Sequence, residues 1–270
     1  MIYSNTTAIL GHLSERDRAI LADIEKFRLL TTRHIQQLHF RVAHDGHLTG
    51  GAATKATMRV LTRLHQHRVI DHLERRIGGV RHGSQGYIWQ LTSTGDHLLR
   101  HLRGEPGRTR YIEPSRLFTE HTLAIADLAV ALHAAAGHAA LELLELETEP
   151  NCWREYVGPH GIPEILKPDL FAVTATGEFE DHWFIEADQG TEHLPQILTK
   201  CAGYTRYEAS GIEQHRTGVF PAVLWVANTP ERAAAIARAI RQDETLPDDL
   251  FQTTSADRFA DYLVTVKDSS

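Results

Sequence analysis

The chain has 270 residues, of which 42% are hydrophobic and 23% are charged, and its formal net charge is −7. This composition is sufficient for a buried hydrophobic core, in one large domain or two small ones. No uncharged apolar segment approaches the ~20 residues that span a bilayer, and the first residues lack the pattern of an export signal. We therefore expect a cytoplasmic protein with no membrane partner. Two cysteines are too few for a disulfide framework or a structural zinc site.

The net charge conceals two halves of opposite sign. Residues 1–110 carry 17 Lys and Arg against 9 Asp and Glu, a balance of +8, and the rest carries 11 against 26, a balance of −15. A basic half joined to an acidic half predicts that one end of the chain meets phosphate and the other has a different task.

The basic half begins with three predicted amphipathic helices. Ser14 is the expected N-cap of the first, Leu29–Thr32 begins the second, and a glycine-rich loop at 44–51 precedes the third. The apolar residues that recur at helical spacing are Ile20, Leu21, Ile24 and Phe27, then Ile35 and Leu38, then Met58, Leu61 and Leu64.

A β-hairpin is predicted after the third helix. Its strands are 69–76 and 87–91, and its tip is glycine-rich and basic. Three helices followed by a basic hairpin resemble a winged-helix DNA-binding domain, and the resemblance covers about 90 residues. It implies that the third helix enters the major groove while the hairpin touches the backbone of double-stranded DNA. The DNA-binding residues that we expect are Thr54, Lys55, Thr57, Arg59 and Arg63 on the helix, and Arg75, Arg76 and Arg81 on the hairpin.

Histidines are frequent in this half, which holds 11 of the 18 in the chain. His65 and His67 share no helical face, and His44 and His47 lie in the glycine-rich loop without further ligands at metal-site spacing. The sequence therefore predicts histidines that face solvent or a DNA groove, and no metal site among them.

The acidic half follows a segment of linker composition at 105–114. The pattern predicts a long helix from Ser115 to Ala136 as the first of six elements in the order α, β, β, β, α, β. Predicted strands are 141–149, 167–175, 182–188 and 222–227, and a helix is predicted over 194–208. Cys152 and Cys201 are expected to be buried or idle thiols.

Acidic residues gather at the ends of two of these strands. The period of two places Glu186 and Asp188 on one face, and Asp169 joins them if its strand forms a hairpin about Thr176–Gly177. Three carboxylates this close repel one another unless a cation joins them, and Mg²⁺ or Mn²⁺ is the expected cofactor. Lys200, on the following helix, would stabilise charge at phosphate. Glu120, on the long helix, is expected to support the site from behind.

These residues also carry a family resemblance. Pro168-Asp169, Glu186-Ala-Asp188 and a helical Lys200 resemble the PD-(D/E)xK nuclease superfamily, although Asp188 stands where that superfamily usually has its lysine. Together with the N-terminal helices, the chain over residues 14–230 resembles the replication-relaxation family of plasmid and conjugative-element proteins. The resemblance implies a role in plasmid replication, transfer or DNA relaxation.

The sequence thus predicts an α/β (α+β) protein of two domains. A winged-helix domain at 1–104 is followed by the linker 105–114 and by a restriction-endonuclease-like domain with a mixed central sheet at 115–270. The leading hypothesis is a Mg²⁺-dependent endonuclease or nickase with Asp169, Glu186 and Asp188 as metal ligands.

Three alternatives stay open. The nuclease-like domain is instead a non-catalytic scaffold of an accessory protein or transcriptional regulator, used for dimerisation or partner docking. The N-terminal domain contacts protein rather than DNA. The chain is a ligand-sensing transcription factor, for which no apolar pocket is marked in the sequence. A homodimer built on the helix from Ser115 and plasmid replication or transfer proteins are the partners considered.

Overall fold

The computed structural model describes residues 9–42, 45–73, 86–105, 115–137, 141–158 and 161–265. The fold is mixed α/β and divides into two units, Met1–Val130 and Ala131–Ser270, here called unit 1 and unit 2. The division falls inside helix α6 (Arg116–Ala136). The expected linker at 105–114 lies almost entirely outside the described residues, so that boundary stays a prediction. None of the helices in the described ranges is long and apolar enough to cross a membrane.

Three capped helices form the first part of unit 1. They are α2 (Glu15–Phe27), α3 (Thr32–His39) and α4 (Gly50–Gln66), with Ser14, Thr31 and Thr49 as N-caps. Ser14 confirms the predicted start of the first helix, because its hydroxyl accepts from the Asp17 backbone N–H at 3.2 Å while the Asp17 carboxylate accepts from the Ser14 N–H at 2.8 Å. Such reciprocal capping satisfies two helix-end donors at once.

A small antiparallel sheet follows, in the order β1-β3-β2. Its strands are β1 (Leu30–Thr31), β2 (Ile70–Leu73) and β3 (Ile88–Leu91), and α5 (Ser93–Arg103) comes next. The hairpin of β2 and β3 was predicted. The second helix was expected to begin at Leu29–Thr32 and begins at Thr32, the last of these residues, because Leu30 and Thr31 first pair with Trp89 and Ile88.

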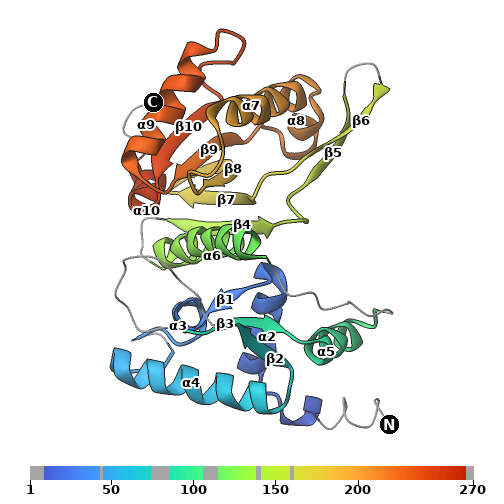
Figure 1. The fold of residues 1–270 in the computed structure, drawn as a ribbon, viewed down its shortest axis with the longest axis vertical. Coiled ribbons are helices and arrows are strands. Elements are labelled where there is room, and N and C mark those ends of the chain that lie inside the picture. Colours follow the sequence, from blue (N-terminus) through green and yellow to red (C-terminus); the bar gives the residue numbers. More distant parts are fainter. Residues whose placement is uncertain are drawn as a thin grey trace. The chain divides into compact units, whose positions relative to one another are not determined.

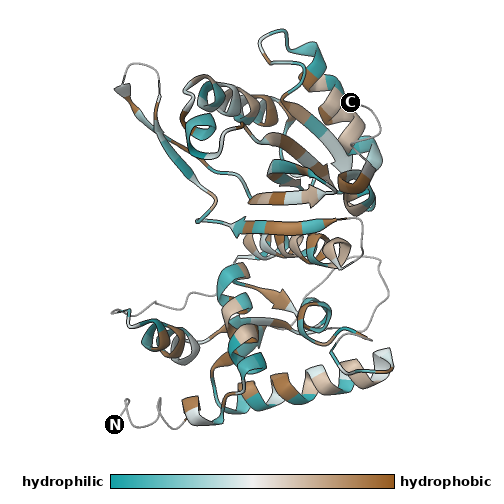
Figure 2. Ribbon diagram, turned by 180° about the vertical axis from the view of Figure 1, so that it is seen from behind, coloured by the Kyte–Doolittle hydropathy of each residue, from teal (hydrophilic) through white to brown (hydrophobic). Residues whose placement is uncertain are grey.

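The core of unit 1 contains most of the apolar residues that the helical spacing indicated, although Leu38 and Met58 are only partly buried. Ile20, Leu21, Ile24, Ile35, Leu61 and Leu64 are each fully buried. Along α4, hydrophobic and hydrophilic residues alternate, as Figure 2 shows by colour. This is the pattern of a helix with one face in the core and one in solvent.

The first part of α6 also belongs to unit 1. His34 of α3 is buried, and its Nε2 lies 2.7 Å from Oδ1 of Asp127 on α6. Because Nδ1 of the same ring accepts from the Thr31 backbone N–H at 3.3 Å, Nε2 is the nitrogen that carries the proton and donates. His34 therefore does not face solvent or a groove, contrary to the expectation for the histidines of this half.

Unit 2 is built on a five-stranded mixed sheet in the order β10-β9-β8-β7-β4 (Figure 1). β8 and β9 are parallel, as are β9 and β10, whereas β7 is antiparallel to both of its neighbours. The β7–β8 hairpin turns at Thr176–Gly177, as predicted. The strands are β4 (Glu142–Thr148), β7 (Leu170–Thr176), β8 (Phe179–Asp188), β9 (Ala222–Ala227) and β10 (Phe251–Ser255).

Helices α7 and α9 pack on one face of this sheet. Phe171, Phe184 and Trp225 of the sheet share a buried cluster with Ile197 of α7 and Ile236 of α9. The helices that follow β8 in the chain are α7 (Leu194–Ala209), α8 (Ile212–Thr217), α9 (Pro230–Gln242) and α10 (Phe259–Thr265).

A two-stranded ribbon of unit 2 was not predicted, and neither was the short helix α8. β5 (Arg154–Val157) and β6 (Pro163–Leu166) pair with each other as a separate antiparallel ribbon that extends away from the central sheet (Figure 1). Each strand of the ribbon has four residues, and a segment that contains glycine separates the two strands. The pattern of alternating apolar residues is therefore weak there.

Candidate functional site

Asp169 and Glu186 face each other across the β7–β8 hairpin. Leu170 pairs with Ile185 at the end of the hairpin. If the same register is extended by one residue, Asp169 lies opposite Glu186. The Asp169 side chain is buried, and its Oδ2 accepts from the Ala187 backbone N–H at 2.8 Å. The predicted hairpin therefore brings these two acids together, one from each strand.

Glu186 is 1% exposed, and both of its carboxylate oxygens have partners on α7. Lys200 Nζ donates to Oε2, and the Tyr204 hydroxyl donates to Oε1. Lys200 and Tyr204 are four residues apart, which puts them on one face of the helix. Asp169, Glu186, Lys200 and Tyr204 are called the acid–lysine cluster below.

The cluster holds two buried carboxylates against one ammonium. Burial raises the pKa of Glu186 from its ordinary 4.5 to about 8; the nearby charge of Asp169 adds to that rise, and Lys200 and Tyr204 oppose it. Burial alone would lower the pKa of Lys200, but the charges of Glu186 and Asp169 raise it overall. Lys200 therefore stays charged, and the cluster holds more buried negative charge than its one ammonium can balance.

Asp188 does not join the cluster, contrary to the expectation that three acids converge. Its carboxylate accepts two hydrogen bonds from Arg232 of α9, from Nε at 2.8 Å and from Nη2 at 3.0 Å. The Gly190 backbone N–H is 3.2 Å from the same carboxylate. Within the described ranges, Asp169, Glu186 and Asp188 do not bring three ligand atoms within 4.8 Å of one another. A two-pronged arginine contact neutralises Asp188 without a metal ion.

Glu120 belongs to unit 1, whereas the cluster is built entirely from unit 2. Its carboxylate is exposed and accepts from Arg116 Nε at 2.8 Å, one turn earlier on α6. The expected supporting role of Glu120 stays a prediction.

On α4, Lys55 and Arg59 lie on the exposed face, one turn apart. Thr54 is exposed near the start of the helix, with its hydroxyl 2.9 Å from the Gly50 carbonyl oxygen and 3.1 Å from Gln36 Oε1. Arg63 is half-exposed, but its Nη2 donates to the buried Asp17 carboxylate of α2 at 2.5 Å. Arg63 therefore ties two helices together.

Thr57 does not face outward, contrary to expectation. Its side chain is fully buried, and the hydroxyl donates to the Ala53 carbonyl oxygen at 2.9 Å. Its position, four residues before the buried Leu61, places it on the core side of α4. The hairpin arginines Arg75, Arg76 and Arg81 lie outside the described residues.

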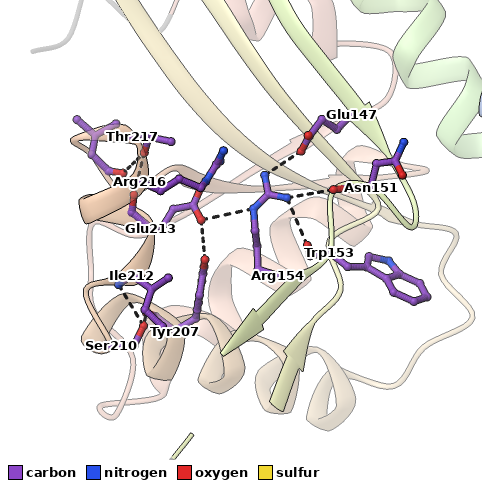
Figure 3. Close-up of polar contacts among 11 residues, drawn as sticks. Glu147, Asn151, Trp153, Arg154, Tyr207, Ser210, Ile212, Glu213, Arg216 and Thr217 are labelled. Carbon is purple, nitrogen blue, oxygen red and sulfur yellow. Dashed lines mark hydrogen bonds and ion pairs between the residues drawn. The ribbon is translucent and has the colours of Figure 1, made fainter. Parts of the chain in front are cut away.

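A second network of buried charges lies on the face of the sheet that α7 covers, as does the acid–lysine cluster (Figure 3). Glu213 of α8 is completely buried; its carboxylate accepts from the Tyr207 hydroxyl at 2.6 Å and from Arg216 Nη2 at 2.5 Å, and Arg154 Nε is 3.4 Å away. Arg154 also donates to Glu147 Oε2 at 2.9 Å. The network joins β4, β5, α7 and α8. Arg154 thus has a structural role, because it connects these elements.

The two cysteines are free and buried, as expected. Burial raises the pKa of the Cys201 thiol to about 12, and it raises that of Cys152 as well. Neither thiol is thereby poised as a nucleophile.

A protein-family model described as replication-relaxation matches residues 21–223, which is well over half of the chain. The chain belongs to the replication-relaxation family. No curated protein and no solved structure matches it. Membership gives this replication-relaxation protein a context of DNA replication or relaxation, and the match extends across α4 and the acid–lysine cluster alike.

Sequence reasoning missed one site residue of the replication-relaxation protein, Arg232, and gave Tyr204 no role. Tyr204 follows Lys200 by four positions, a spacing that places both side chains on one helix face. Arg232 carried no such signal, because its contact with Asp188 joins α9 to the end of β8 across 44 residues of chain.

Proposed function

We propose that this replication-relaxation protein binds double-stranded DNA through unit 1, with Lys55 and Arg59 of α4 at the interface. The observation that carries the proposal is the pair of exposed cations on α4, in a half of the chain whose balance is +8. The order of α2, α3 and α4 followed by the β2–β3 hairpin supports a winged-helix assignment, and in a winged helix the third helix enters the major groove.

The division of labour along α4 supports this assignment. Ala53, Thr57, Leu61 and Leu64 face the core, and Lys55 and Arg59 project from the other side. Lysine and arginine contact phosphates, and arginine also reads guanine edges in the major groove. Arg63 contributes less, because the buried Asp17 carboxylate already holds its guanidinium.

The test is DNA binding measured by fluorescence anisotropy on a labelled duplex. We expect Lys55→Ala/Arg59→Ala to weaken binding about tenfold or more, since each lost contact costs ~1–3 kcal/mol. The matched control is Arg238→Ala/Arg241→Ala, which removes the same charge from exposed positions on α9 of unit 2. Equal weakening by the two double variants would overturn the placement on α4, since only overall charge would then matter.

A second candidate function is Mg²⁺-dependent phosphodiester cleavage by unit 2. The observation that favours it is the meeting of Asp169 and Glu186 across one hairpin with Lys200 of the next helix directed at them. The donor set suits Mg²⁺, which proteins bind through one or two carboxylates, with water and substrate phosphate completing the shell. Asp169 and Glu186 would hold the ion, and Asp188 would not, because Arg232 holds it.

The ion, when bound, would acidify a water molecule and neutralise charge on the scissile phosphate. For the protein's own residues, Glu186 would bind the ion as a carboxylate, its proton passing to solvent, and would exchange its contact with Lys200 for the ion. Lys200, 30% exposed, would then be free to turn toward the phosphate. Tyr204 would continue to hold Glu186 by its hydroxyl.

The test of this candidate is conversion of supercoiled plasmid with Mg²⁺ or Mn²⁺. Asp169→Asn and Lys200→Met are expected to lose cleavage while keeping DNA affinity, since both lie in unit 2. Tight binding without cleavage by the unaltered protein would instead favour a non-catalytic accessory or regulatory protein, in which Asp188 and Arg232 mark a nuclease-like scaffold that has lost its chemistry.

A further inference from the structure

Three side chains with metal-binding atoms meet at the edge of the small sheet in unit 1. His65 comes from the last turn of α4, and Asp71 and His72 are consecutive residues of β2. His65 Nε2 lies 3.3 Å from Asp71 Oδ1, and His72 Nδ1 lies 3.8 Å from the same oxygen. Within the described ranges this is the one group of three His, Cys, Asp or Glu residues whose ligand atoms all lie within 4.8 Å of one another.

The spacing suits a small cation. Two ligands on a tetrahedral ion, bound at ~2.0–2.1 Å, are roughly 3.3 Å apart. The His65–Asp71 pair already has this separation, and a small rotation of the partly exposed rings would bring the others to it.

An unsatisfied nitrogen is directed at the same point. His72 Nδ1 is buried and has no hydrogen-bond partner among the described residues. The ring is held by its neighbours, with the centroid of Tyr87 at 4.3 Å and that of Trp89 at 5.4 Å. A buried ring nitrogen without a hydrogen-bond partner is unusual in proteins, and a bound metal ion would give it one.

We propose that His65, Asp71 and His72 bind a divalent transition-metal ion, with Zn²⁺ as the first candidate. Two imidazole nitrogens and one carboxylate oxygen are borderline ligands that select Zn²⁺ and its neighbours, whereas Mg²⁺ and Ca²⁺ prefer all-oxygen sites. Three protein ligands leave a further position for water or another ligand. This site is independent of the acid–lysine cluster and of the proposed cleavage.

Among the described residues, no backbone hydrogen bond of His65, Asp71 or His72 joins α4 to β2. The ion would therefore connect these two elements through side chains. α4 carries the exposed cations Lys55 and Arg59, and β2 leads into the hairpin. Binding would thus fix the C-terminal end of α4 to β2 and stabilise the folded form of unit 1, since a ligand that binds only the folded state raises its stability.

The experiment is calorimetric titration of the full-length, tag-free protein with ZnCl₂ after treatment with a chelator. With 18 histidines in the chain, weak binding elsewhere is expected, so the decisive signal is one tight equivalent. We expect His65→Ala and His72→Ala to abolish that equivalent, Asp71→Asn to weaken it at least about tenfold, and His67→Ala, next to the site, to retain it.

A second readout guards against variants that misfold. Zn²⁺ should raise the thermal midpoint of the unaltered protein and of His67→Ala, and not that of His65→Ala, whose ring is partly exposed and whose loss the fold should tolerate. Co²⁺ in place of Zn²⁺ should give visible absorption bands of a low-coordinate nitrogen–oxygen site. No tight equivalent, or one that survives in both His65→Ala and His72→Ala, would show that the three residues form only an ion pair.

Discussion

Glu186 is the residue on which the electrostatics of unit 2 depend. Its carboxylate is buried between Lys200 and Tyr204, and Asp169 faces it from the neighbouring strand. Burial places its pKa near 8, far above the value that the same side chain has in an unfolded chain. The folded state therefore binds a proton that the unfolded state releases over the range between the two pKa values.

This difference predicts a pH dependence of stability. From pH ~4.5 to ~8 the folded state holds more protons than the unfolded one, so Glu186 should lower the free energy of unfolding as pH rises, by at most about 1.4 kcal/mol per pH unit. Glu186→Gln, which keeps the shape and stays neutral, should remove this slope. Urea unfolding of both proteins at pH 5.5, 7 and 8.5 measures it. The assignment would be contradicted if the free energies of unfolding of the two proteins changed with pH in parallel. It would also be contradicted if the native protein became more stable relative to the variant as pH rises.

Arg232 supplies a second prediction at this scale. Asp188 is 4% exposed and relies on Arg232 for its charge balance. Removing one partner of a buried ion pair costs about 3–5 kcal/mol, whereas removing both costs far less. We expect Arg232→Met to destabilise the protein by about 3 kcal/mol and Asp188→Asn/Arg232→Met to recover most of that loss in urea unfolding. Equal loss in the single and double variants would mean that the two charges do not depend on each other.

At the scale of elements, the β5–β6 ribbon is attached to the sheet through Arg154. The guanidinium of this residue contacts Glu147 of β4 and Glu213 of α8, and it lies over the ring of Phe171 at 4.9 Å. Four elements thus share one buried arginine.

Arg154→Met should therefore loosen several elements together. We expect a loss of about 2 kcal/mol or more, because Glu213 keeps Arg216 and Tyr207 as partners but loses one cation. Amide hydrogen exchange should then accelerate in β5, β6 and α8. Arg206→Met is the control, since its pairing with Glu164 is exposed. Similar acceleration in both variants would argue against the network as the anchor.

The elements were largely predictable from sequence, and the reasons differ from one to the next. β9 and α7 follow from uninterrupted periodicity, and the hairpin register that sets Asp169 against Glu186 follows from a glycine turn. β1 could not be predicted, because two residues give no period and its pairing with β3 depends on residues 57 positions away. Thr57 was misassigned because its polarity suggested solvent, whereas the helical hydroxyl is satisfied by its own backbone.

The partners of charged residues were harder to predict than the elements. Lys200 was placed correctly near the acids, but no sequence pattern indicated that Arg232 would bind Asp188, or that Asp71 and His72 would lie beside His65. Each of these contacts joins elements whose approach is set by packing, and no local pattern encodes it.

In the whole molecule the two units differ in charge. The basic unit 1 exposes Lys55 and Arg59, whereas the acidic unit 2 holds Glu186, Asp188 and Glu213 in buried ion pairs. If phosphate contact is the task of unit 1, binding must release counterions and depend steeply on salt in spite of the net charge of −7. That dependence separates contact with phosphate from a winged helix used for protein contacts.

Contact between α4 and DNA phosphate should appear in the salt dependence of duplex binding. The logarithm of the association constant is measured against the logarithm of salt concentration for the native protein, for Lys55→Ala/Arg59→Ala and for Arg238→Ala/Arg241→Ala. We predict a steep linear decrease for the native protein, a slope shallower by about 2 for the α4 variant, and an unchanged slope for the control. A flat native plot, or an α4 variant that follows the native line, would contradict the claim that α4 meets DNA phosphate.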